Sequence, residues 1–253
     1  MSEAPALPRQ RASERIAETL RREIIAGRSI DRTPVLMARF GVSRPTLREA
    51  FRVLESERLI EVRHGSRSGV RALRPAADSA ARITGQALQA AGATVEQLYE
   101  AREAFEPFAA ALLARRRDRR DIVALRAAHD ELSAMIDARA WTDLAVGLAR
   151  FHHRLVELTG NQMLTLTAAT IASLLEMHQR NRDRATEPVE PDEDHLEFRS
   201  RGVRSIARLT RLIEAGDASG AEAHWREHLI NSAQFWLDGQ DRYAVLDIVG
   251  APA

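Results

Sequence analysis

The sequence predicts a mainly α-helical protein in which three helices and a β-hairpin come first and an all-α antiparallel bundle of six or seven helices follows. Apolar residues recur at helical spacing almost throughout the chain after residue 94, and a β-hairpin pattern occurs only in residues 59–73. Charge divides in the same way. Residues 1–74 hold 16 arginines and 9 acidic residues, a net charge of +7, and the remainder carries −6. A basic part joined to an acidic part indicates a polyanion-binding module attached to a second domain, unless surface charge has simply drifted.

The first two helices are short. One is expected over 13–26, because apolar residues repeat every four positions from Ile16 to Ile24 and Gly27 follows where a helix would stop. The other is expected over 34–40.

The third helix follows a tight turn at Gly41, and Ser43 is a suitable N-cap for it. Its apolar stripe has the i, i+3, i+4, i+7 spacing of a buried face: Leu47, Ala50, Phe51 and Leu54. At 100° per residue, Arg44, Arg48 and Arg52 then share a neighbouring exposed face.

Two short β runs, 59–63 and 70–73, enclose a Gly/Ser-rich turn and predict a hairpin. Three helices and a hairpin in this order form a winged helix-turn-helix, which we assign to residues 10–74. Residues 75–93 are expected to be a linker or a short helix.

The second domain is assigned to residues 94–239, with a C-terminal tail over 240–253. Its breaks fall at Gly160, at the two prolines of 187–191 and at Gly216. A further short helix is expected near 78–91, before the main set. The main helices are expected over 95–117, 119–138, 141–159, 162–184, 193–215 and 218–238.

The composition excludes several classes of protein. There is no cysteine, which excludes disulfides, thiolate metal sites and a cysteine nucleophile. No run of about 18 apolar residues occurs, and residues 1–10 lack the charged-then-apolar order of a secretory signal. We therefore expect a cytoplasmic protein with no membrane contact.

The third helix has the chemistry of a DNA-recognition helix. Its first turns present hydroxyl and guanidinium groups while its apolar face is fixed in a core. Such a helix fits a major groove about 12 Å wide, where Arg reads guanine edges and hydroxyls hold phosphates. The candidate contacts are Ser43, Arg44, Thr46, Arg48 and Arg52. The alternative is an ordinary surface helix with solvated arginines.

Residues 41–50, which read GVSRPTLREA, resemble the core motif of the winged-helix domain in the GntR family of bacterial regulators. The resemblance covers about 12–73. It implies that Arg44, Thr46 and Arg48 contact DNA, and that the wing tip lies near the minor groove. The wing candidates are His64, Gly65 and Arg67.

One departure from the family lies between the first two helices. The family has a longer connection there, with an Arg that touches DNA, and here Pro34 falls at about that position. One usual contact is therefore missing. Arg32 or Arg39 offers electrostatic compensation.

The second domain is similar to the FadR-like branch of the same family, whose FCD-type helical domain surrounds a small-molecule pocket. Three patches carry the likeness over about 94–237: Arg102 to Glu106 with Ala109-Ala110, Phe151-His152 with Gly160-Asn161, and Gly216-Asp217 with Ala221 and His228-Leu229.

Many members of this branch hold a divalent metal with one Asp and three His. Here His152 and His228 match two of those positions, but Leu148 replaces the Asp and Ile206 replaces the middle His. Two imidazoles make a poor divalent site, since zinc takes three or four protein ligands. We therefore expect a metal-free pocket and no cofactor; the alternative is a site rebuilt by His224 with His152 and His228.

The expected effector is a small molecule, such as a carboxylate with an apolar part. The residues expected to bind it are Arg102, Leu148, His152, Ile206 and His228. For Arg102 two roles stay open: a carboxylate clamp, or a structural ion pair with Glu106 one turn along the helix.

The sequence thus predicts a homodimeric, sequence-specific transcriptional regulator, a repressor or an activator, rather than an enzyme. One alternative is a ligand-independent DNA-binding protein, in which Leu148 and Ile206 would pack without a cavity between them. Another is a helical enzyme with a basic appendage, whose acid–base groups would be His152, His153, Glu157, Glu176, His178 and His228.

Overall fold

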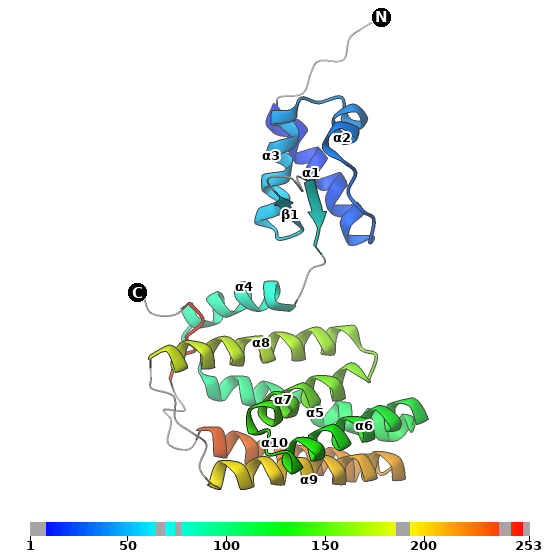
Figure 1. Ribbon diagram of the computed structural model, residues 1–253, viewed down its shortest axis with the longest axis vertical. Coiled ribbons are helices and arrows are strands. Elements are labelled where there is room, and N and C mark those ends of the chain that lie inside the picture. The colour runs from blue at the N-terminus through cyan, green and yellow to red at the C-terminus, as the bar shows by residue number, and fades with distance from the viewer. Residues whose placement is uncertain (1–8, 64–68, 74–76, 186–192, 238–243, 250–253) are drawn as a thin grey trace, which may run out of the picture. The chain divides into compact units, whose positions relative to one another are not determined.

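The computed structural model describes residues 9–63, 69–73, 77–185, 193–237 and 244–249 (Figure 1). The chain divides into two compact units, Met1–Ser79 and Ala80–Ala253. We call them the N-terminal unit and the C-terminal unit. In the described parts of both, no helix combines the length and apolar composition needed to cross a bilayer.

The N-terminal unit has the three helices and the hairpin that the sequence predicts. Its elements are α1 (Arg9–Ile25), α2 (Thr33–Phe40), α3 (Arg44–Ser56), β1 (Ile60–Arg63) and β2 (Gly69–Ala72). The strands are antiparallel, with Val62 opposite Val70. Helices α1 and α2 both pack on α3, so the winged helix-turn-helix is confirmed.

The turn between α2 and α3 depends on glycine. Gly41 has φ of 62°, a left-handed conformation that costs side-chain-bearing residues energy, and its N–H bonds the carbonyl of Met37. Ser43 occupies the N-cap of α3 as expected, although its side chain makes no capping hydrogen bond. The Ser43 hydroxyl instead lies 3.1 Å from the hydroxyl of Thr46.

The C-terminal unit is helical as predicted, and the short helix expected near 78–91 is present. Its helices are α4 (Ala77–Ala90), α5 (Val95–Arg116), α6 (Arg119–Asp137), α7 (Trp141–Glu157), α8 (Gln162–Ala185), α9 (Glu193–Ala215) and α10 (Ala218–Leu237). The first of these begins three residues before the boundary between the units.

Helix α5 is the centre of this unit, because it packs against α7, α8, α9 and α10 (Figure 1). A capping box fixes its start, with Thr94 accepting from the backbone of Gln97 and the Gln97 side chain accepting from Thr94. A helix enclosed by four others must be apolar around most of its circumference, and α5 has buried residues along its whole length.

A proline inside α5 removes one helical hydrogen bond. Pro107 has no N–H, so the carbonyl of Glu103, four residues earlier, loses its usual donor. Arg226 of α10 replaces it, with Nη1 donating to that carbonyl at 3.4 Å. The contact between α5 and α10 therefore includes a hydrogen bond that satisfies the carbonyl left without a donor by the proline.

The C-terminal segment departs from the expected tail. Within residues 244–249, Leu246 is fully buried and Ile248 is 9% exposed, whereas Val245 and Val249 are exposed. Val245 forms a β-bridge with Thr94, and the backbone N–H groups of Ile248 and Val249 donate to Gln89 of α4. We call residues 244–249 the C-terminal strap. It joins α4, the start of α5 and α8 in one apolar cluster.

Candidate functional site

Helix α3 presents three arginines on one exposed face. Arg44, Arg48 and Arg52 are all exposed, while the opposite stripe of α3 is buried in the core of the N-terminal unit. Arg52 is paired with Glu49 at 3.0 Å. Within the described residues, no carboxylate pairs with Arg44 or Arg48. A rigid helix with free guanidinium groups suits groove binding.

The other expected DNA contacts divide into two groups. Ser43 is exposed, but the side chain of Thr46 is only 6% exposed, so it faces the core instead of sharing the arginine face. The wing-tip candidates His64, Gly65 and Arg67 lie outside the described residues.

The two arginines offered as compensation for Pro34 differ in availability. Nη1 and Nη2 of Arg39 donate to Glu23, at 3.0 and 2.5 Å, so this arginine is neutralised within the unit. Arg32 is exposed at the N-cap of α2. Of the two, Arg32 is the side chain still open to a phosphate.

The C-terminal unit contains a cavity of about 1310 Å³ whose walls come from α5, α7, α8, α9 and α10. Four of the five expected effector residues line it: Arg102, Leu148, His152 and His228. The fifth does not. Ile206 is fully buried on the stripe of α9 that packs into the core, together with Val203 and Ile213. An aliphatic side chain gains more from that core than from a wet cavity wall.

Glu106 of α5 is the polar centre at one end of the cavity. Its side chain is 3% exposed and accepts three hydrogen bonds: from Arg102 Nε at 2.8 Å, from His152 Nδ1 at 2.7 Å and from Trp225 Nε1 at 3.0 Å. The structural ion pair is therefore present, and it occupies the Nε of Arg102. Three donors on one carboxylate satisfy a buried charge that would otherwise be costly.

The protonation states at this end follow from the contacts. Burial alone would raise the pKa of the Glu106 carboxyl, but the Arg102 charge and the hydrogen bonds from its partners hold it well below its usual range. Burial lowers the pKa of His152, and burial together with His152 lowers the pKa of His228 to about 3. Glu106 is thus ionised and both imidazoles are neutral near pH 7. His152 must then carry its proton on Nδ1, where it donates to Glu106.

The histidine arrangement does not fit a metal. The rings of His152 and His228 stack face to face, with centroids 5.4 Å apart and planes 21° apart, so their in-plane lone pairs do not converge on one point. His224 is held by Ser205, with Nε2 2.9 Å from that residue's carbonyl oxygen. Among the described side chains, no three His, Asp or Glu residues are grouped to hold an ion.

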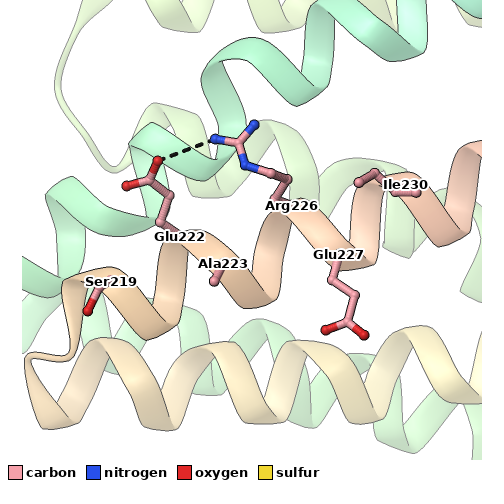
Figure 2. A pocket seen from close by; sticks show the side chains of 6 residues that line it. All are labelled: Ser219, Glu222, Ala223, Arg226, Glu227 and Ile230. Carbon is pink, nitrogen blue, oxygen red and sulfur yellow. Dashed lines mark hydrogen bonds and ion pairs between the residues drawn. The ribbon is translucent and has the colours of Figure 1, made fainter.

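A second, shallower depression of about 490 Å³ lies on α10 (Figure 2). Its cation is neutralised within the fold, because Arg226 pairs with Glu222 at 3.3 Å and lies 3.8 Å from Glu103. The remaining lining includes one large apolar side chain, Ile230. The larger cavity is therefore the better candidate for a ligand.

Two family models match this sequence. One, described as the FCD domain, matches residues 97–231, and the other, described as bacterial regulatory proteins of the gntR family, matches residues 12–70. The chain belongs to the GntR family. It is a DNA-binding regulator of the GntR type with an FCD effector-binding domain, as the resemblance at residues 41–50 implies.

One solved structure supports the fold of this GntR-family chain, and a second is similar at a lower TM-score. A Streptococcus agalactiae GntR protein is similar at a TM-score of 0.64 and 19% identity, over 88% of this chain and 99% of that one. Lar of Listeria monocytogenes is similar at a TM-score of 0.44 and 17% identity, over 92% and 97% of the two chains. None of the curated proteins compared with the sequence matches it.

The sequence reasoning missed Trp225 and Arg199. Trp225 is fully buried, donates to Glu106 and stacks on His228 with centroids 4.3 Å apart. Its signal was the i, i+3 spacing from His228 on one helix face. Arg199 of α9 lines the cavity. No sequence signal distinguishes it from the many other arginines, because its environment is set by helices distant in the chain.

Proposed function

We propose that this GntR-family regulator binds a near-palindromic operator as a homodimer and that a small molecule in the cavity controls the binding. A two-fold dimer would place two α3 helices in successive major grooves. A ligand that favours one placement of the DNA-binding units would change operator affinity. By linkage, DNA would change ligand affinity by the same factor. Such a protein acts in the cytoplasm, where the operator lies.

The DNA-binding part of the proposal is carried by Arg44 and Arg48, which are exposed and have no carboxylate partner among the described residues, on a helix whose other face is fixed. In α3 the unpaired arginines lie on a helix that is held in place by its buried stripe. An ordinary surface helix has no need of this combination. Arg52 would contribute less, because Glu49 already neutralises it.

The cavity supports control by an effector. In a ligand-independent regulator, Leu148 and Ile206 would both pack in the core with no cavity between them. Ile206 does pack in the core. Leu148, in contrast, lies on the wall of a cavity of about 1310 Å³, large enough for a small organic molecule.

A catalytic role is less well supported. Glu106 and His152 form an acid–base pair at 2.7 Å, but the carboxylate is already engaged by three donors and is nearly fully buried. Neither Leu148 nor Ile206 supplies a nucleophile or a ligand. We therefore propose a regulator without enzymatic activity.

The DNA-binding proposal is tested by selecting duplexes from a random-sequence pool with the purified protein and measuring the affinity of the best duplex by fluorescence anisotropy. We expect R48A to lose about 1–3 kcal/mol of binding free energy and to relax sequence preference, because a bidentate base contact is removed. The matched control is R22A. Arg22 is an exposed arginine of α1 paired with Glu18, so this variant has the same charge change away from the proposed groove face.

The control should lose only the salt-dependent, sequence-independent part of binding. Equal losses in R48A and R22A, or an unchanged selected sequence in R48A, would contradict the assignment of α3 as the reading helix.

A further inference from the structure

We infer that the turn between α5 and α6 binds the phosphate backbone of duplex DNA, as a second DNA-contacting surface apart from α3. Residues 115–120, which we call the arginine turn, read RRRDRR and hold five arginines and one aspartate. The chain after residue 74 carries a net charge of −6, so this cluster of positive charge is a local exception. The inference goes beyond the proposed function, from which it takes only that the protein binds DNA.

Arg116 fixes the arginine turn against the rest of the bundle. Its Nε donates to Asp121 at 3.0 Å, and its Nη1 donates to the backbone carbonyl of Thr159 at 3.1 Å. Asp118 caps the start of α6, where its Oδ1 accepts from the backbone N–H of Arg120 at 2.8 Å. Both acidic residues of this region therefore serve the fold, and the backbone of the turn is held in one shape.

The other four arginines of the turn are exposed: Arg115, Arg117, Arg119 and Arg120. In the described part of the chain, no carboxylate lies within ion-pair distance of any of the four. The pKa of Glu214 is lowered mainly by the hydrogen bond from Arg126 and to a smaller extent by the more distant charge of Arg117, so this carboxylate already has its partner. Four cations are thus clustered within six residues without neutralisation.

Folding alone does not account for the arginines at the start of α6. Arg119 and Arg120 occupy its first two positions. A helix N-terminus carries partial positive charge, so cations there destabilise a helix, whereas cations near a C-terminus stabilise it. The second effect explains Arg115 and Arg116 in the last turn of α5, but it does not explain Arg119 or Arg120. Unfavourable and unpaired charges at a fixed position indicate a ligand of the opposite charge.

The composition of the arginine turn favours DNA over an acidic protein as that ligand. Protein–protein interfaces have an apolar centre with a polar rim, and residues 115–120 include no apolar side chain. Nucleic-acid interfaces are instead polar and strongly positive, because guanidinium groups donate directly to phosphate oxygens. DNA is also the polyanion that a regulator of the GntR type binds. The phosphates could belong to DNA that flanks the sequence bound by α3 or to a second duplex, and the experiment has an arm for each.

The experiment uses the full-length protein and the duplex selected from the random-sequence pool. Affinity is measured for that duplex and for the same duplex extended on both sides by about two helical turns of mixed sequence. The variant R117Q/R119Q/R120Q is compared with R139Q/R150Q/R204Q, which removes the same charge from three separate exposed positions of the C-terminal unit. Arg139 also matches Arg117 in its left-handed conformation, with φ of 54° against 48°.

We expect R117Q/R119Q/R120Q to bind the extended duplex about 10- to 100-fold more weakly than the wild type. The slope of log K against log salt concentration should become shallower by about 2 to 3, because each lost phosphate contact removes about 0.9. R139Q/R150Q/R204Q should change both quantities much less, because its three arginines do not lie together.

The two sources of phosphate give different results. A loss of affinity for the extended duplex, but not for the selected duplex alone, identifies flanking DNA. Capture of a second, labelled duplex by the wild type on the selected duplex, and not by R117Q/R119Q/R120Q, identifies the second duplex. Either result supports the inference.

R119E/R120E separates binding from folding. Acidic residues in the first turn of a helix are favourable, so without DNA this variant should melt at or above the wild-type temperature. It should nevertheless bind the extended duplex more weakly than R119Q/R120Q, because the carboxylates repel phosphate. A marked fall in the DNA-free melting temperature would identify Arg119 and Arg120 as structural residues and overturn the inference.

The inference is equally overturned if R117Q/R119Q/R120Q and R139Q/R150Q/R204Q lose affinity alike, or if the affinity and the salt slope of the first stay at wild-type values. An acidic protein would then be the remaining candidate for the arginine turn. Failure of the wild type to select any duplex would refute the proposed regulator, whereas intact selection with an unchanged arginine-turn variant would refute this inference alone.

Discussion

Glu106 gives the most demanding test of how the C-terminal unit is stabilised. Replacement by leucine keeps a similar volume but removes the acceptor shared by Arg102, His152 and Trp225. Arg102 would be left as a largely buried cation, since its side chain is 14% exposed. Removing one member of a buried pair in this way costs about 3–5 kcal/mol.

The double variant R102M/E106L should recover part of that loss. With the cation gone, the remaining cost comes from the Trp225 N–H, because His152 can turn its free nitrogens to water in the cavity. One buried donor without a partner costs about 1–3 kcal/mol. The double variant should thus be about 2 kcal/mol more stable than E106L, and adding R102M alone completes the double-mutant cycle.

The assay is urea unfolding followed by tryptophan fluorescence. The three tryptophans of the chain, Trp141, Trp225 and Trp236, all belong to the C-terminal unit, so the signal reports this unit alone. The matched control is E176L, which removes an exposed i,i+4 carboxylate from Arg180 and should cost no more than about 0.5 kcal/mol. The reasoning is refuted if E106L costs as little as E176L, or if R102M/E106L is no more stable than E106L.

Two further predictions concern the same unit. G85A should destabilise it by about 1–3 kcal/mol, because a Cβ there would lie 2.6 Å from Leu174 Cδ2 and 2.9 Å from Ile248 Cγ2, whereas G202A, whose Cβ would lie 3.5 Å from Leu148, should be neutral or stabilising in the same urea assay. The unit should also lose stability on acidification from about pH 7.5 to 5. Burial lowers the pKa of His228 to about 3 in the folded state against about 6.5 unfolded, so the unfolded chain takes up the proton first, and up to about 2 kcal/mol is lost. An H228Q variant with the same pH dependence as the wild type would argue against this source.

Much of the fold could be predicted because its signals are local. Helix ends at Gly27, Gly160 and Gly216 coincide with left-handed glycines, and the apolar periodicity between them fixes each helix. The strap could not be predicted in this way. Residues 244–249 are too few to show a period, and their burial depends on α4 and α8, which are distant in the sequence.

The site was predicted unevenly for a similar reason. The resemblance predicts the same environment for Leu148 and Ile206, because both replace ligands of the family's metal. The spacing of Val203, Ile206 and Ile213 already places Ile206 on the core stripe of α9, so the apolar periodicity indicates its environment better than the family's ligand positions do. The Arg199 environment has no local signal, since the acceptor for its Nη1 is a backbone carbonyl of α7.

The strap also bears on the order in which a newly made chain acquires its activities. The buried residues of the N-terminal core lie between residues 16 and 60, and the last side chain packed against them is Ala72. The cluster that contains Ala81 also needs Leu246 and Ile248, which are synthesised after all of the helices from α4 to α10. Domains fold as units during synthesis, so the DNA-binding unit should be folded before the C-terminal unit can close. In each nascent chain the recognition helix α3 is therefore formed before the C-terminal unit is complete.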